Sequence, residues 1–284
     1  MFNTLIFTLG IVFTVVTFFF VRESINVEAC LRTNYRDRKI TALGGLYFLI
    51  PFLIVLGAVQ IENNVNYKVQ FVTPALVIVA LGFAFLGLID DLIGDKTSQG
   101  FKGHIKALLK GKLTTGGLKL IGGPAVCFIA LMPYVERTGY EVLILGVISI
   151  SLTANLVNLL DLAPGRSLKV SSIAMLVAVI LEAQYSWQFG ILGIFLVLLF
   201  VDLKEMMMLG DIGSNMIGAI VGLSIANNLT LNQLYAFVVI LFALNLLSEF
   251  VSFSKIINSF LPLRFFDTLG QTKERKDWLK KKLA

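Results

Sequence analysis

The chain has 284 residues, of which 57% are hydrophobic and 15% charged, and its formal net charge is +6. A soluble domain of this length carries more charge and lacks repeated apolar runs of about 20 residues, so that class is excluded. The positive charge is better explained by Lys and Arg retained in cytoplasmic loops of a membrane protein, and we expect no nucleic-acid partner.

Nine apolar segments separated by short polar stretches predict an all-α, polytopic membrane protein. Several are shorter than the roughly 20 residues of a full crossing, so their ends are fixed only to within a few residues. Arg22 follows the first segment and no basic residue precedes it, the reverse of a signal peptide, which predicts a retained span. The segments are 2–21, 43–61, 71–89, 118–134, 142–160, 168–181, 187–201, 212–226 and 231–253.

The distribution of basic residues predicts the orientation. All but Lys68 and Arg137 of the 24 Lys and Arg residues fall on one side of the membrane in a nine-span topology. The positive-inside rule makes that side cytoplasmic, which places the N-terminus outside and the C-terminus inside. We therefore expect a transmembrane domain over residues 1–253 and a basic cytoplasmic tail over residues 254–284.

Carboxylates also gather at span ends on this predicted cytoplasmic side. A charge at mid-bilayer costs about 2.5–3.5 kcal/mol, so such carboxylates usually line a polar cavity or the interface. Solvation of helix ends is the alternative for any single residue, but clusters on separate loops of one face favour a shared site. The residues are Asp90, Asp91, Asp95, Asp161, Asp202, Glu205 and Asp211.

The first cluster is Gly87-Leu-Ile-Asp-Asp-Leu-Ile-Gly-Asp95. Adjacent carboxylates at a helix end repel each other unless a cation or a proton offsets their charge. Paired Asp residues beside an open cavity suit Mg²⁺, which takes one or two carboxylates together with substrate phosphates and water. Asp90 and Asp91 are therefore candidates for a magnesium-dependent site.

The second cluster places Asn155, Asn158 and Asp161 at every third position, on one side of a helix. Binding of a polar substrate is one interpretation, and hydrogen bonding between helices is the alternative for the two amides. Pro164-Gly165 then turns the chain, and Arg166 and Lys169 follow as candidates to face an anionic phosphate.

The third cluster is Met208-Leu-Gly-Asp-Ile-Gly-Ser-Asn215. Its glycines, Gly210 and Gly213, allow close backbone approach, and the helix that begins here presents free N–H groups to anions. Asp211 as a simple helix cap is the alternative, although a cap leaves the flanking glycines unexplained.

Two basic stretches complete the candidates. Arg36-Asp-Arg-Lys-Ile-Thr-Ala-Leu-Gly-Gly45 leads into a glycine pair and, alone, favours the positive-inside rule with close helix packing. Lys102, Lys106 and Lys110 recur every four residues, as a basic stripe that fits lipid headgroups or a substrate diphosphate. Lys204, in the loop 202–211, is a further candidate for substrate binding.

Together the motifs resemble the polyprenyl-phosphate N-acetylhexosamine-1-phosphate transferase superfamily, which includes the phospho-N-acetylmuramoyl-pentapeptide transferase of peptidoglycan synthesis. The resemblance runs from about Arg36 to Glu249, in family order. Its elements are Gly44-Gly45 (Pro-x-x-Gly-Gly motif), Asp90-Asp91 (Asp-Asp motif), Asn155-x-x-Asn158-x-x-Asp161, and Gly210-Asp-Ile-Gly-Ser214 (Gly-Asp-x-Gly-Ser motif).

The resemblance implies Mg²⁺-dependent transfer of a sugar 1-phosphate from a UDP-sugar to polyprenyl phosphate, with release of UMP, in the plasma membrane of a bacterium. It implies Asp211 as the Mg²⁺ ligand and Asp90 as the candidate base, with Asp91 in support. Asp161 would be a further catalytic residue that, with Asn158, helps to bind the nucleotide diphosphate or the metal. Direct attack and a covalent aspartyl route both stay open, as does a homodimer. Substrate-binding residues would be Asn155, Asn158, Arg166, Lys102, Lys204, Gly213 and Ser214.

The sequence departs from the family pattern in several places. It has nine apolar segments where the family has ten, lacks a histidine-rich motif in the tail, and has Asp-Leu-Ala-Pro-Gly-Arg after Leu160 in place of Asp-Gly-Leu-Asp-Gly. Thr41 replaces the proline before Gly44-Gly45. The second hypothesis is therefore a non-catalytic relative that binds polyprenyl phosphate or a partner enzyme. A secondary transporter is disfavoured, because charged elements at mid-bilayer in repeated halves are missing.

Overall fold

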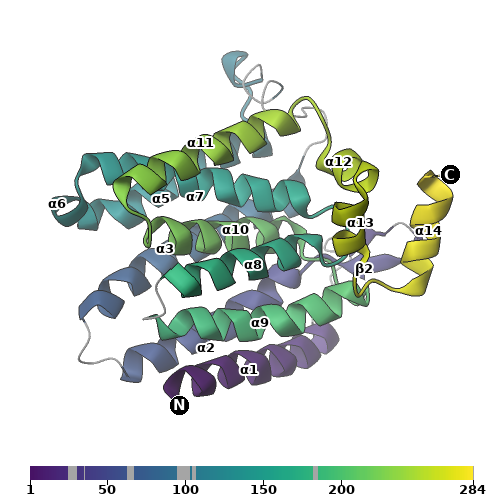
Figure 1. Cartoon of the computed structure of the whole chain (residues 1–284), viewed down its shortest axis with the longest axis horizontal. Helices are drawn as coiled ribbons and strands as arrows, with labels where there is room; N and C mark the ends of the chain where they lie inside the picture. Colours follow the sequence, from purple (N-terminus) through teal and green to yellow (C-terminus); the bar gives the residue numbers. More distant parts are fainter. Residues whose placement is uncertain are drawn as a thin grey trace.

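The computed structural model describes residues 1–24, 31–34, 36–62, 67–94, 103, 107–181 and 185–283, and for residues 67–72 the backbone alone. Within these ranges the long helices lie side by side, with α11 along one edge of the molecule and α1 along the opposite edge (Figure 1). They are α1 (Phe2–Ser24), α2 (Gly44–Glu62), α3 (Tyr67–Ile93), α5 (Thr115–Leu131), α7 (Tyr140–Leu160), α8 (Arg166–Leu181), α9 (Ser186–Leu203), α10 (Gly210–Ala226) and α11 (Leu231–Ser248).

Seven segments of the described chain are long and apolar enough to cross a membrane. They are α1, α2, Thr73–Ile93 of α3, Thr115–Thr138 (α5 with the short helices η2, Met132–Tyr134, and α6, Val135–Thr138), α7, α9 and α11. The prediction of an all-α, multi-pass membrane protein is confirmed. α10 has 17 residues and α8 has 16, so the count of nine spans stays a prediction.

Helix α10 is the centre of the bundle. Every residue from Ile212 to Ser224 is buried, and the helix packs against α2, α3, α7 and α8. A Cβ atom at Gly218 would lie 2.7 Å from the Cα atom of Ala154, and one at Gly222 would lie 3.0 Å from that of Ile150. Small residues one turn apart thus let α7 and α10 touch along their backbones, as is common between membrane helices.

A short hairpin precedes α2, where the sequence predicted only a loop. Strands β1 (Leu31–Thr33) and β2 (Lys39–Thr41) pair antiparallel. The Asn34 side-chain oxygen accepts the backbone N–H groups of Arg36 at 2.9 Å and Arg38 at 3.0 Å, and Asp37 adopts a φ of 59°. An Asn side chain that accepts backbone N–H groups a few residues later in the chain favours a tight turn of this kind.

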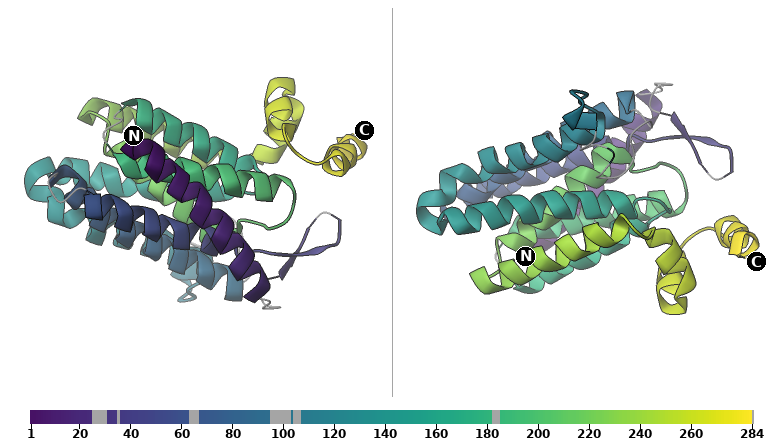
Figure 2. Two further views of the ribbon diagram at one scale, coloured as in Figure 1. Left: turned by 90° about the horizontal axis from the view of Figure 1, so that it is seen from below. Right: turned by 90° about the horizontal axis from the view of Figure 1, so that it is seen from above.

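The predicted basic tail folds into three helices, α12 (Phe253–Ser259), α13 (Leu261–Thr268) and α14 (Lys273–Leu283). They lie at one end of the bundle, where α12 and α13 turn steeply away from the direction of the long helices (Figure 1) and α14 lies farther out (Figure 2). Helices α3, α7 and α9 end here, and α5, α8 and α10 begin here. We call this end of the bundle the polar end. The three predicted clusters and the basic stretch 36–45 therefore meet at the same end of the molecule.

Candidate active site

Two carboxylates from different helices converge on one lysine at the polar end. Asp90 lies in the last turn of α3 and Asp211 in the first turn of α10. The Nζ atom of Lys119, on α5, lies 2.5 Å from Oδ2 of each carboxylate. All three side chains are partly buried, so the repulsion between the carboxylates is strong and the shared ammonium offsets it.

Glycines allow the helices that carry Asp90 and Asp211 to approach each other closely. A Cβ atom at Gly87, one turn before Asp90, would overlap the carbonyl oxygen of Asp211, and one at Gly45 would lie 2.7 Å from the amide nitrogen of Gly213. Gly210 has a φ of +71°, a conformation that favours glycine, and it turns the chain into α10. The glycine pair that begins α2 therefore packs against the start of α10, as the packing alternative for that motif predicted.

Asp91 holds the first turn of α10 in place. Its Oδ2 atom accepts the backbone N–H of Ile212 at 3.0 Å, while the side chain of Arg32 donates to its backbone carbonyl. A carboxylate at a helix N-terminus is favoured by the free N–H groups there. The capping role that the sequence suggested for Asp211 thus belongs to Asp91, and the Asp211 side chain is directed to Lys119.

Asn158, on α7, is joined to the same start of α10. The Ser214 hydroxyl lies 2.9 Å from the side-chain oxygen of Asn158 and 2.9 Å from the carbonyl oxygen of Gly210, and its single proton serves one acceptor at a time. Two of the predicted substrate-binding residues, Asn158 and Ser214, therefore lie in contact with each other beside the Asp211 turn.

Asp161 caps the end of α7 and accepts a hydrogen bond from the Ser167 hydroxyl at 2.6 Å. Burial raises the pKa of this carboxyl to about 6, against the lowering effect of the Ser167 hydrogen bond. The turn that follows is held by Asp202, whose buried carboxylate accepts the backbone N–H of Gly165 at 2.8 Å. Asp161 is thus held in place by Ser167, and burial keeps its pKa well above that of an exposed carboxyl.

A cavity of about 230 Å³ opens beside Asp161. Its walls come from the hairpin, the α7–α8 turn, the loop before α10, and α14. The polar lining residues include Asn34, Asp161, Asp202, Glu205 and Arg275. Met208 and Leu209 also line it, and Asp211 follows them directly along the chain, so the cavity adjoins the segment that carries the carboxylate cluster.

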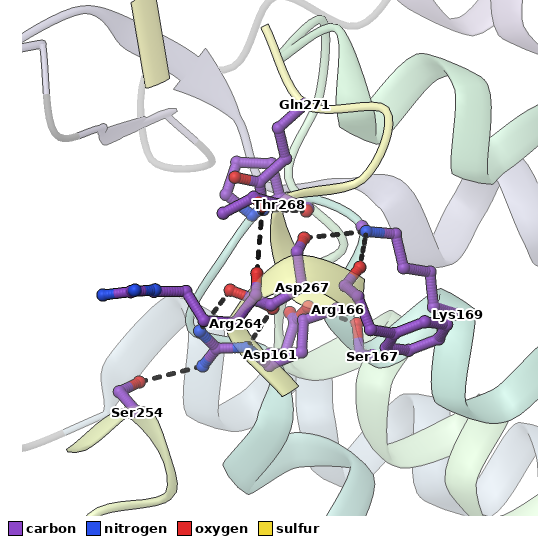
Figure 3. Close-up of polar contacts among 12 residues, drawn as sticks. Asp161, Arg166, Ser167, Lys169, Ser254, Arg264, Asp267, Thr268 and Gln271 are labelled. Carbon is purple, nitrogen blue, oxygen red and sulfur yellow. Dashed lines mark hydrogen bonds and ion pairs between the residues drawn. The ribbon is translucent and has the colours of Figure 1, made fainter. Parts of the chain in front are cut away.

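Arg166 and Lys169 do not face open space for a phosphate, contrary to the sequence prediction. The Arg166 guanidinium donates to both carboxylate oxygens of Asp267, at 2.7 and 3.0 Å, and to the Ser254 hydroxyl at 2.8 Å (Figure 3). Lys169 donates to the backbone carbonyls of Phe266 and Asp267, at 2.9 and 2.7 Å. Both cations bind the tail, which supplies a carboxylate and two carbonyls that the sequence alone did not connect to them.

Of the other predicted substrate-binding residues, Asn155 and Lys204 make contacts away from the cluster, whereas Gly213 lies in the first turn of α10 beside it. Asn155 is exposed and donates to the side-chain oxygen of Asn245 on α11 at 2.7 Å, so it forms the helix–helix hydrogen bond that was its alternative. Lys204 is exposed, with its Nζ 5.7 Å from the centre of the Phe200 ring. Gly213 contributes close packing against α2. Lys102, with Asp95 and Lys106 of the same loop, lies outside the described residues.

Sequence reasoning did not identify the partners of several residues at this end. Lys119 was counted only for topology, although a lysine inside an apolar span is itself a sign of function. Glu205 accepts from Arg36 at 3.2 Å and from the Thr272 hydroxyl at 3.0 Å, which joins the hairpin, the α9–α10 loop and the tail. Arg275 lines the cavity from α14. No local pattern reveals these long-range partners.

The donor set suits a hard cation bound with help from a substrate. Asp90 and Asp211 already hold one positive charge between them, that of Lys119. Among the described residues, no three His, Cys, Asp or Glu side chains gather closely enough to form a complete cage for a metal. Mg²⁺ does not need one, because it usually binds one or two carboxylates and completes its shell with phosphate oxygens and water.

Comparison with protein families and with curated proteins finds no relative of this chain: no protein-family model and no curated protein matches it. The geometry of the polar end is therefore the basis for the functional proposal that follows.

Proposed function

We propose that this protein transfers a sugar 1-phosphate from a UDP-sugar to a polyprenyl phosphate and releases UMP, with Mg²⁺ as cofactor. The observation that supports it best is the convergence of Asp90 and Asp211 on the single ammonium of Lys119. Further support comes from the residues of all four family-like motifs that gather around the start of α10, namely Gly45, Gly87, Asp91, Asn158 and Ser214.

The reaction joins two anions, so the site must offset their repulsion. An oxygen of the lipid phosphate attacks the phosphorus that carries the sugar, and the bond from that phosphorus to the bridging oxygen of UMP breaks. A phosphate monoester, with a second pKa of about 6, is mostly dianionic at neutral pH and needs no base to attack. Mg²⁺, held by Asp90 and Asp211, would supply positive charge to the phosphates during this transfer.

The neighbouring residues have defined tasks in this proposal. Asp90 and Asp211 would hold the cation, and the Lys119 ammonium beside them would pair with a phosphate oxygen of the substrate. Asp91 keeps the first turn of α10 in register through Ile212. Asn158 and Asp161 face the nucleotide diphosphate from α7. The basic loops would lie in the cytoplasm of a bacterium, with the N-terminus outside, and a homodimer is compatible with this arrangement.

The second candidate is a non-catalytic relative that binds polyprenyl phosphate. It is favoured by the tail, which occupies Arg166 and Lys169, and by a cavity of about 230 Å³. Ligand pockets usually measure roughly 300–1,000 Å³. This candidate predicts that lipid phosphate still binds after Asp90→Asn.

A donor screen distinguishes the two candidates. The purified protein in lipid is incubated with undecaprenyl phosphate, Mg²⁺ and, in turn, UDP-GlcNAc, UDP-GalNAc or UDP-MurNAc-pentapeptide, and UMP is measured. Turnover with one donor supports the transferase. Binding of undecaprenyl phosphate without turnover of any donor, beside an active control enzyme, supports the non-catalytic relative.

A further inference from the structure

The tail helix α13 has its polar side toward the protein and its apolar side outward. Asp267 is only 4% exposed, whereas Leu261 is 65% and Phe265 67% exposed. Soluble proteins show the opposite pattern, with charged groups outside and large apolar side chains inside. A contiguous set of exposed large apolar side chains marks a surface that meets a partner or a membrane.

The orientation of α13 is fixed from its inner side. Asp267 forms a two-pronged ion pair with Arg166, and both side chains are buried. Lys169 holds the carbonyls of the last turn of α13, and the Gln271 amide donates to the carbonyl of Pro164 at 3.0 Å. Because this clamp joins α13 to the turn between α7 and α8, the apolar face cannot rotate inward without breaking buried ionic contacts.

The apolar face of α13 follows, along the chain, a membrane helix with an exposed apolar surface. α11 qualifies as a membrane span, and only Leu234 and Leu241 of its residues are buried. Its exposed residues include Val239, Ile240 and Phe242, and Phe250 and Phe260, which lie between α11 and α13 along the chain, are also exposed. Figure 1 shows α13 at the end of the bundle and across the direction of the long helices, where the boundary of a bilayer crossed by these helices would lie.

Basic side chains accompany this surface. Lys255 is exposed on α12, and Arg264 lies on α13 itself. Long cationic side chains at the membrane surface keep their charge among headgroups while their stems cover apolar area. Anionic headgroups attract such residues. The charge therefore favours a lipid surface over an apolar protein partner.

We propose that α13 lies in the boundary between headgroups and acyl chains, with Leu261, Phe265 and Leu269 in lipid and Asp267 clamped to the α7–α8 turn. The lipid surface then helps to position the turn that carries Asp161. This inference requires a membrane-spanning bundle and does not depend on the transferase activity.

Spin labels on the full chain in phosphatidylcholine–phosphatidylglycerol nanodiscs test it. Single cysteines replace Phe265, Phe242 and Asp277 in turn, in a background with Cys30→Ser and Cys127→Ala. Phe242 on α11 is the lipid-exposed reference, and the exposed Asp277 on α14 is the reference in water. We expect the ratio of oxygen to nickel-chelate accessibility at Phe265→Cys to match Phe242→Cys and to exceed Asp277→Cys several-fold.

Two outcomes would overturn the inference. A label at Phe265→Cys as accessible to the nickel chelate as that at Asp277→Cys would place α13 in water. A label shielded from both reagents, with dipolar broadening, would show that a second copy of the chain covers this face. Leu261→Cys, one turn earlier, must give the same result as Phe265→Cys, and the two reference labels verify that each preparation is folded.

Discussion

Asp90 and Asp211 share one counter-ion: each carboxylate places an oxygen 2.5 Å from the Nζ atom of Lys119. The two residues come from helices that lie far apart in the sequence, and each helix brings its carboxylate to the polar end. Three charges in so small a volume are costly to bury unless they bind each other or a ligand. The cluster is therefore the place where an added cation should have the largest effect.

Removal of Lys119 should make the protein dependent on divalent cations. In Lys119→Met the two carboxylates repel each other without an ammonium between them, which lowers the melting temperature in EDTA. Mg²⁺ should then restore it, because ligand binding to the folded state stabilises that state. Differential scanning fluorimetry measures both effects. The double variant Lys119→Met/Asp211→Asn is the control, and an equal Mg²⁺ response in both variants would contradict the assignment.

Gly45, the second residue of α2, should not tolerate a side chain. Gly45→Ala would force a Cβ against the amide nitrogen of Gly213 and the side chain of Ile212. Overpacking of this kind costs about 1–3 kcal/mol. Gly57→Ala, on the same helix, meets no atom within 4 Å and should leave stability unchanged or raise it slightly. Thermal unfolding of both variants in one detergent checks the contrast, and equal losses would exclude the close contact.

The buried pair of Arg166 and Asp267 should hold the tail. Arg166→Met leaves Asp267 buried without its cation, at a cost of about 3–5 kcal/mol. The double variant Arg166→Met/Asp267→Leu removes both charges and should recover most of that loss. Glu274→Gln, in the first turn of α14, removes only an exposed ion pair with Arg36 and should change stability little. Protease cleavage between α11 and α14 reports the release of the tail, and a double variant no better than Arg166→Met would argue against the pair.

Asp161 should make stability fall as pH rises through the weakly acidic range. Its pKa is about 6 in the folded protein and about 3.9 in an unfolded chain. Between these values the folded state binds more protons than the unfolded state, so its stability declines from about pH 4 to about pH 6. Asp161→Asn should remove this part of the decline. Melting temperatures across that range measure it, and an identical pH profile for both proteins would refute the shift.

The sequence revealed the class of the protein because the signals involved are local. Apolar run length and loop charge predict a multi-pass helical protein, and spacing placed Asn158 and Asp161 near the site. The alternative interpretations were also informative: helix packing explains Asn155, through Asn245, and Gly213, through Gly45. Short motifs thus indicated the neighbourhood more reliably than the role of each member.

The remaining features depend on contacts between distant segments. The sequence around Lys119 does not indicate that this lysine pairs with both Asp90 and Asp211. The sequence around Arg166 does not indicate that its partner is Asp267. The tail looked like a solvated basic segment, because charge composition does not reveal that its buried carboxylate, Asp267, pairs with Arg166 or that its backbone carbonyls bind Lys169. The hairpin was missed because strands as short as Leu31–Thr33 give little periodicity to read.

The most direct test of the central claim is release of UMP from a UDP-sugar and undecaprenyl phosphate by the wild-type protein and by Asp211→Asn. Glu136→Gln, exposed at the opposite end of the bundle, is the matched control. We predict Mg²⁺-dependent release by the wild type and by Glu136→Gln, and a loss of about 100-fold or more in Asp211→Asn, since preorganised electrostatic groups contribute on that scale. Equal rates for Asp211→Asn and the wild type, or no release with any donor in the screen, would contradict the account.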